Sequence, residues 1–140
     1  IGDFRFVSGE TRKVKVTFDE NASQYSGIDC MTSWNKLWGS SRCGYLQHHH
    51  SDSDRFVWRK HGATPQIEIA AYAYDQDVVP YRANDGNLLQ IFTTVLNTGV
   101  KYTLQMDLKI DSTEFVLQDE NGYELEKIAV AHGNQCENYF

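Results

Sequence analysis

Arginine and aromatic residues alternate along residues 55–60, where Phe56 and Trp58 occupy one set of positions and Arg55 and Arg59 the other. Successive side chains of a β-strand point to opposite faces, so a strand that packs Phe56 and Trp58 into a core presents both arginines on its outer face. A guanidinium group offers paired donors to a carboxylate, a sulfate or the hydroxyls of a sugar. The segment therefore predicts a short basic strip.

Residues 66–74 are expected to form the next strand of a hairpin, with small or branched side chains on its packed side and polar or aromatic ones beside the basic strip. Sugars stack their C–H surfaces on aromatic rings, while their hydroxyls need charged or amide partners. We therefore predict a ligand-binding face whose candidate residues are Arg55, Arg59, Glu68, Tyr72, Tyr74, Trp34, Trp38 and His49. The alternative for each residue is a cross-strand pair that only stabilises a sheet.

Three consecutive histidines lie just before an acidic segment, and imidazole and carboxylate groups are common ligands of zinc and copper. On a strand His48 and His50 share one face and His49 points away, so the metal-ligand candidates are His48, His50 and Asp52. A polar loop is the preferred interpretation, and no metal ion or other cofactor is assigned. The segment Asp52–Asp54 lacks the glycine and distal glutamate of a calcium loop, so a turn cap is favoured there.

Sequence motifs of the common catalytic sites are missing: there is no Gly-x-Ser-x-Gly, no glycine-rich nucleotide loop and no His-Glu-x-x-His. Glu68 also has no acidic residue two positions away, as the carboxylate pair of a sandwich-fold glycosidase requires. His49, Tyr72 and Arg59 supply the base and the charge-neutralising group that a polysaccharide lyase uses. The sequence favours a non-catalytic glycan-binding module, with a polysaccharide lyase or hydrolase and a structural or partner-binding protein as alternatives.

Strand-like alternation dominates the elements that must position these residues. It is clearest at residues 101–110 and recurs at residues 14–18. Further strands are expected at residues 4–8, 55–60, 66–74, 88–95, 114–118 and 123–130, bounded by glycine-containing turns such as Asn121-Gly122. Many short strands without a long amphipathic helix predict an all-β single domain over residues 1–140, a two-sheet antiparallel β-sandwich of jelly-roll-like or concanavalin-like arrangement.

Residues 30–44 are the exception to this alternation. Trp34, Leu37 and Trp38 recur at helical spacing after Ser33, a residue type that caps helix N-termini. The pattern predicts one short helix over residues 33–38, with a long loop as the alternative.

The charge balance of the chain bears on its partners. The chain has 140 residues and a formal net charge of −6, from 13 basic and 19 acidic residues, which argues against nucleic-acid binding. Lys13 and Lys15 share one strand face, which we interpret as a solvated surface. No apolar run reaches the length of a transmembrane segment, and residues 1–10 have no apolar core like that of a signal peptide.

The chain has three cysteines, Cys30, Cys43 and Cys136, which are compatible with one disulfide or with none. A bridge between Cys30 and Cys43 is as well supported as the absence of a bridge.

A resemblance lies in the middle third of the chain, at residues 34–39, at His48–His50, at Arg55 with residues 58–59, and at residues 67–72. These segments resemble small β-rich envelope proteins of bacteria, whose function is uncharacterised. The resemblance implies export, as a secreted or lipid-anchored protein of the cell envelope, and it brings no catalytic residues.

Overall fold

The computed structural model describes residues 10–23, 34–41, 53–74 and 89–131, which form strands with a single short 3₁₀-helix. The elements in chain order are β1 (Glu10–Thr17), η1 (Glu20–Ser23), β2 (Asn35–Ser41), β3 (Ser53–Lys60), β4 (Gln66–Tyr74), β5 (Leu89–Ile91), β6 (Leu96–Asn97), β7 (Lys101–Leu108), β8 (Ser112–Asp119) and β9 (Glu124–Ala131). Within these ranges no helix is long and apolar enough to cross a membrane.

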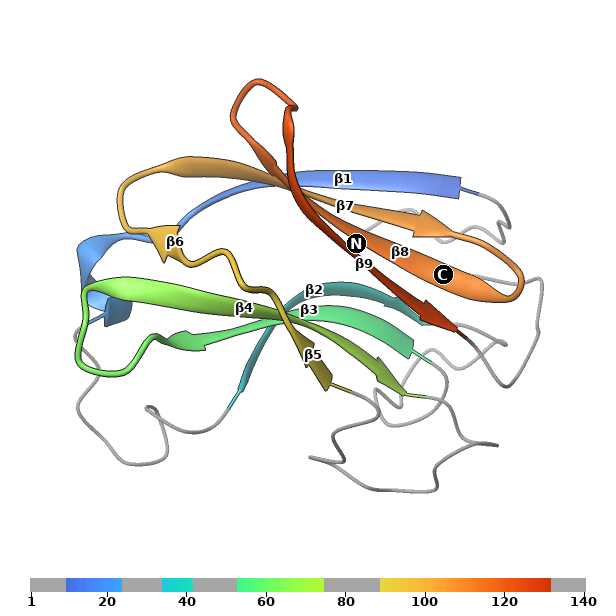
Figure 1. Cartoon of the computed structure of the whole chain (residues 1–140), viewed down its shortest axis with the longest axis horizontal. Helices are drawn as coiled ribbons and strands as arrows, with labels where there is room; N and C mark the ends of the chain where they lie inside the picture. The colour runs from blue at the N-terminus through green and yellow to red at the C-terminus, as the bar shows by residue number, and fades with distance from the viewer. Residues whose placement is uncertain (1–9, 24–33, 42–52, 75–88, 132–140) are drawn as a thin grey trace, which may run out of the picture.

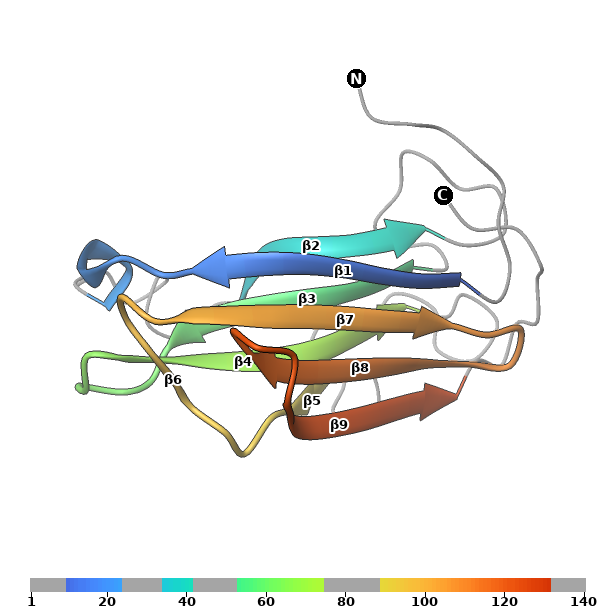
Figure 2. The ribbon, with the colours of Figure 1, turned by 90° about the horizontal axis from the view of Figure 1, so that it is seen from above.

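Two antiparallel sheets face each other, which confirms the predicted β-sandwich (Figure 1). The four-stranded sheet has the order β1-β7-β8-β9, and the five-stranded sheet has the order β2-β3-β4-β5, with β6 also paired to β4. The strand axes of the two layers are roughly aligned when the molecule is viewed from above, with the edge strand β1 lying over the edge strand β2 (Figure 2). This aligned packing is the usual solution for two sheets that each have one apolar face.

The core between the sheets is centred on Phe56 of β3, which is fully buried. Its ring makes an edge contact with Phe115 of β8 at 5.1 Å between centroids and lies 6.1 Å from Phe92 and from Trp38. These rings join both sheets and the segment that leaves β5. The prediction that Phe56 faces the core is therefore confirmed, and the alternate residues of β3 point to the outer face.

The helix predicted over residues 33–38 is wrong, because Asn35 to Ser41 form strand β2, paired with β3. The register of this pair shifts between Lys36 and Trp38, which marks a β-bulge. The bulge turns the consecutive residues Leu37 and Trp38 toward the same core. Two adjacent apolar residues on one side imitate helical spacing in the sequence, which explains the error.

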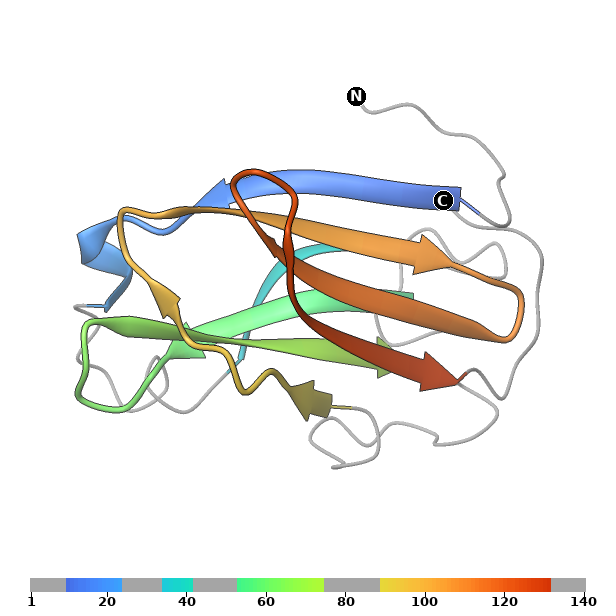
Figure 3. The ribbon, with the colours of Figure 1, turned by 45° about the horizontal axis from the view of Figure 1, so that its top comes forward.

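The strand expected over residues 88–95 is interrupted. Pairing with β4 stops at Ile91 and resumes only at Leu96, while Phe92 turns into the core. Figure 3 shows the segment from β5 through β6 running along the edge of the sandwich and up to β7 in the other layer. The carboxylate of Glu126 in β9 fixes this segment, accepting hydrogen bonds from the backbone N–H groups of Thr93 and Thr94 at 2.9 and 2.8 Å.

The strand expected at residues 4–8 and the three cysteines lie outside the described residues. The turns at Gly99 and Gly122 are described, and both glycines have positive φ, 77° and 89°. The left-handed backbone conformation of these two turns is the reason the sequence places glycine there.

Candidate functional site

The register between β3 and β4 brings four of the eight predicted ligand residues together on the outer face of the five-stranded sheet. Arg55 lies opposite Tyr72, and Arg59 lies opposite Glu68. Directly opposite residues share a face, so the four side chains project away from the core, as alternation predicts. The two pairs are four residues apart along β3, which corresponds to about 13 Å at the rise of a β-strand. We call this surface the outer face below.

Arg59 is the centre of a paired cluster at one end of the outer face. Its Nε donates to Glu68 Oε2 at 2.5 Å, and its guanidinium carbon lies 4.2 Å from the ring centroid of Trp34. His61 Nδ1 lies 3.0 Å from the other oxygen, Oε1, of Glu68. Both oxygens of this carboxylate are therefore occupied, and the charge of Arg59 is balanced by an ion pair and a cation–π contact.

Electrostatics at Glu68 follow from these contacts. Burial of the side chain on its own raises the pKa of the Glu68 carboxyl, but hydrogen bonds from Arg59 and His61, together with their charges, outweigh burial and lower it. Glu68 is thus held ionised as a partner of Arg59. A carboxylate held in this state is poorly suited to act as a general acid.

Arg55 has a different environment at the other end of the outer face. It lies opposite Gly39 of β2, where an added Cβ would stand 2.6 Å from Arg55 Cγ, so the absence of a side chain at Gly39 provides the space that the arginine stem fills. The Nε atom of Arg55 is buried and has no hydrogen-bond partner among the described residues. Burial lowers the pKa of this guanidinium, and the neighbouring charge of Asp54 partly opposes the change.

Lys36 of β2 is a second cation near Arg55. It is exposed and lies opposite Val57, two residues along β3 from Arg55. Burial and the charge of Arg55 both lower the pKa of the Lys36 ammonium. Neither Lys36 nor Arg55 forms an ion pair or a side-chain hydrogen bond with another described residue. Arg59, in contrast, forms both.

Between the two ends lie Val57 and Ala70, which face each other across β3 and β4. Both are buried although they belong to the outer face. The outer face is therefore divided into the Arg59 end, where charges are paired, and the Arg55 end, where two cations lie together.

Not every predicted site residue reaches this surface. Trp38 lies on the inner face of β2, stacked on Phe56 with an interplanar angle of 15°, so the structure removes it from the candidate site. Tyr74 is the last residue of β4, and its side chain is not among those described. The remaining candidates, His49 for the ligand and His48, His50 and Asp52 for a metal, lie outside the described residues. Among the described residues no group of three potential ligands is placed to hold a metal ion.

Asp54 differs from the turn cap that its sequence context favours. It belongs to β3 and is fully buried on the inner face, where it accepts a hydrogen bond from the hydroxyl of Thr113 at 2.8 Å. Its neighbour across β2, Ser40, is also buried and accepts a hydrogen bond from Arg12 at 3.1 Å. Asp54 shares the parity of Phe56, so the turn-cap expectation overlooked that the alternation of residues 55–60, extended by one residue, points Asp54 inward. These contacts link the two sheets and are structural.

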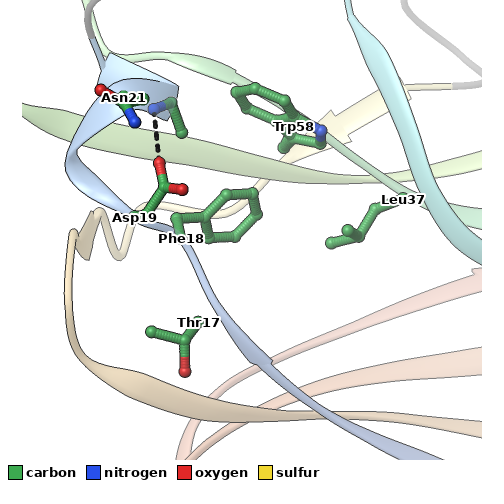
Figure 4. A pocket seen from close by; sticks show the side chains of 7 residues that line it. Thr17, Phe18, Asp19, Asn21, Leu37 and Trp58 are labelled. Atoms are coloured by element: carbon green, nitrogen blue, oxygen red, sulfur yellow. Dashed lines mark hydrogen bonds between the residues drawn. The ribbon is translucent and has the colours of Figure 1, made fainter.

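A shallow hollow of about 410 Å³ lies at the open edge where β1 and η1 approach β2 and β3. Figure 4 shows the ring of Phe18 turned toward Trp58, with Leu37 across from both and Asp19 on the rim. The two ring centroids are 5.2 Å apart, and Phe18 is only 8% exposed. Asp19 is engaged by the backbone N–H of Ala22 at 3.2 Å. The two rings contact each other at an interplanar angle of 53° and Phe18 is almost fully buried, so this hollow offers less aromatic surface to a ligand than the outer face does.

On the outer side of the four-stranded sheet two carboxylates are engaged by neighbouring side chains. Asp107 accepts hydrogen bonds from Thr11 at 2.6 Å and from Gln105 at 3.0 Å, and Glu114 pairs with Lys109 at 2.8 Å. Such exposed pairs form an ordinary solvated sheet surface.

Comparison of the chain with known protein families, with curated proteins and with solved structures finds no match. The class that the fold defines is a two-sheet antiparallel β-sandwich.

Proposed function

We propose that this protein is a non-catalytic binding module that holds a glycan on the outer face of its five-stranded sheet. The observation that supports the proposal is the placement of Arg55, Arg59, Glu68, Tyr72 and Trp34 on one side of adjacent strands. Guanidinium and carboxylate groups pair with sugar hydroxyls, and aromatic rings take the C–H surfaces between them.

The spacing of these groups also favours binding over catalysis. Arg59 and Tyr72, which the lyase alternative uses together, belong to register pairs about 13 Å apart along the strands. A base and a charge-neutralising group must both reach one reacting centre within hydrogen-bond distance. A glycan chain, in contrast, extends over several sugar units and is able to contact both ends of the outer face.

The proposal is tested by applying the purified protein to an array of neutral and acidic glycans, beside the double variant Arg59→Gln/Tyr72→Ala. Wild type is expected to bind a restricted set of glycans, and the variant to lose that binding. The matched control is Lys13→Gln/Thr103→Ala, which makes similar changes on the four-stranded sheet, where Lys13 is exposed on β1 and Thr103 lies on β7. The proposal fails if wild type binds no glycan on the array, or if the control loses binding as much as the outer-face variant does.

The other two functions give different results in companion measurements. Release of unsaturated or reducing ends from a polysaccharide panel identifies a lyase or hydrolase. Recovery of a stoichiometric protein partner, without either glycan binding or cleavage, identifies a structural or partner-binding protein. We also propose, from the resemblance in the middle third, that the protein is exported to the cell envelope, and fractionation of cells that express the full-length gene product tests this location.

A further inference from the structure

The positive charges of the outer face are not equivalent. Arg59 is balanced by Glu68 at 2.5 Å, and Trp34 covers its guanidinium. Arg55 and Lys36 form no ion pair with a carboxylate of the described residues, although the charge of the adjacent Asp54 acts on Arg55. A protein of net charge −6 thus keeps two neighbouring cations on its outer face outside any ion pair with the described strands.

The Arg55 side chain fills a space that exists only because residue 39 is a glycine. Gly39 leaves open the space beside the arginine stem, and a methyl group there would overlap both the backbone carbonyl of Asp54 and the side chain of Arg55. The Nε of this guanidinium is buried without a hydrogen-bond partner, whereas neither terminal nitrogen is among the buried atoms that lack one. A buried donor left without a partner lowers the stability of the fold. The position is therefore maintained at a cost to stability, as is common at binding sites.

Lys36 adds a second positive charge from the adjacent strand. Lys36 and Arg55 carry like charges on the same face of neighbouring strands, so an anion between them relieves a repulsion that is unfavourable in the free protein. Arginine supplies directional paired donors and lysine supplies a point charge, a combination that suits an oxyanion. Tyr72, opposite Arg55 on β4, bounds the same position with an aromatic ring.

We infer that Arg55 and Lys36 bind the oxyanion of an acidic glycan, either the carboxylate of a uronic acid or a sulfate ester. The inference rests on the proposed function and assigns the charged substituent to the Arg55 end, with the remainder of the glycan extending along β3 toward Trp34. Acidic glycans are then bound more tightly than their neutral counterparts.

The inference is tested by calorimetric titration with polygalacturonate, with the same polymer after reduction of its carboxyl groups, and with dextran sulfate beside dextran. Wild type is expected to bind the carboxylated or the sulfated polymer at least about tenfold more tightly than its neutral counterpart, since loss of one ion pair of about 1.4 kcal/mol is a factor of ten. Which acidic polymer shows this preference distinguishes a uronate from a sulfate ester.

The variant Lys36→Gln/Arg55→Gln is expected to lose the preference for the acidic polymer while retaining its fold by circular dichroism. The control Lys13→Gln/Lys15→Gln removes the same charge from β1, where both lysines are exposed, and is expected to bind within about twofold of wild type because distant exposed charges are screened. If the double glutamine variant does not fold, Arg55→Lys, which keeps the charge but loses the paired donors, takes its place and is expected to weaken acidic binding several-fold.

Outcomes separate this inference from the proposed function. Equal binding of acidic and neutral polymers, or equal losses in the two double variants, overturns the inference and leaves glycan binding standing. Binding of inorganic sulfate at the Arg55 guanidinium, observed by NMR without binding of any glycan, supports the anion site and overturns the proposed function. Binding of neither sulfate nor glycan overturns both.

Discussion

Replacement of Gly39 by alanine tests how closely the fold and the candidate site depend on each other. An ideal Cβ at this position overlaps the backbone carbonyl oxygen of Asp54 and stands 2.6 Å from Arg55 Cγ. The arginine side chain is able to move, but the carbonyl oxygen belongs to the paired strand β3 and moves only with the strand. Gly39→Ala is therefore expected to push β2 away from β3 and to displace the Arg55 side chain from the space beside residue 39.

The size of this effect follows from two opposing contributions. Overpacking of this kind costs roughly 1–3 kcal/mol, and removal of a glycine from the unfolded chain returns about 0.4–1 kcal/mol. The net prediction is a loss of about 1–2 kcal/mol in the free energy of unfolding. For a domain of this size the melting temperature then falls by roughly 3–8 °C.

Urea unfolding of wild type and Gly39→Ala, followed by tryptophan fluorescence, measures this loss. Lys36→Ala is the control on the same strand, because Lys36 is exposed and its truncation is expected to stay within about 0.5 kcal/mol. One result would refute the argument that the missing side chain at Gly39 makes room for Arg55. It is a Gly39→Ala variant at least as stable as wild type, with an unchanged NMR signal from the Arg55 guanidinium.

Three further predictions concern the scaffold and the paired end of the outer face. Glu126→Ala removes the acceptor of hydrogen bonds from Thr93 and Thr94 and is expected to cost about 2 kcal/mol in urea unfolding, whereas an unchanged midpoint would show that this link is dispensable. Phe56→Ala empties a fully buried position between the sheets and is expected to cost about 3–5 kcal/mol by the same measurement; a loss below about 1 kcal/mol would contradict the central place of this ring. The pKa of Glu68 is lowered in the folded state, so its stabilisation is present above the ordinary value of 4.5 and is lost as the pH falls below it. The stability difference between wild type and Glu68→Gln should therefore shrink below about pH 4.5, and a difference that stays constant down to pH 3 would count against the ion pair.

Alternation in the sequence predicted the outer face because side-chain direction on a strand has a fixed period of two. Arg55 and Arg59 share one parity, Glu68 and Tyr72 share another, and packing of Phe56 and of the small residues of β4 decided which side faces the core. That inference needs no knowledge of distant parts of the chain.

Features that depend on register or on a local irregularity escaped prediction. The bulge at Lys36 displaced Trp38 from the expected surface to the core, and a single inserted residue leaves no periodic signal. The sequence also treated Arg55 and Arg59 as equivalent. Only the alignment of β3 with β4 shows that Arg59 meets Glu68 while Arg55 meets an aromatic ring and Gly39.

Titration of ¹⁵N-labelled protein with an acidic oligosaccharide, followed by two-dimensional NMR, tests most directly that the outer face of the five-stranded sheet binds a glycan. The account predicts chemical-shift changes concentrated at Gly39, Arg55, Tyr72 and the indole of Trp34, with small changes along β1 and β9. Changes concentrated on the four-stranded sheet or in the hollow beside Phe18 would contradict the account, as would a spectrum that does not change at saturating oligosaccharide.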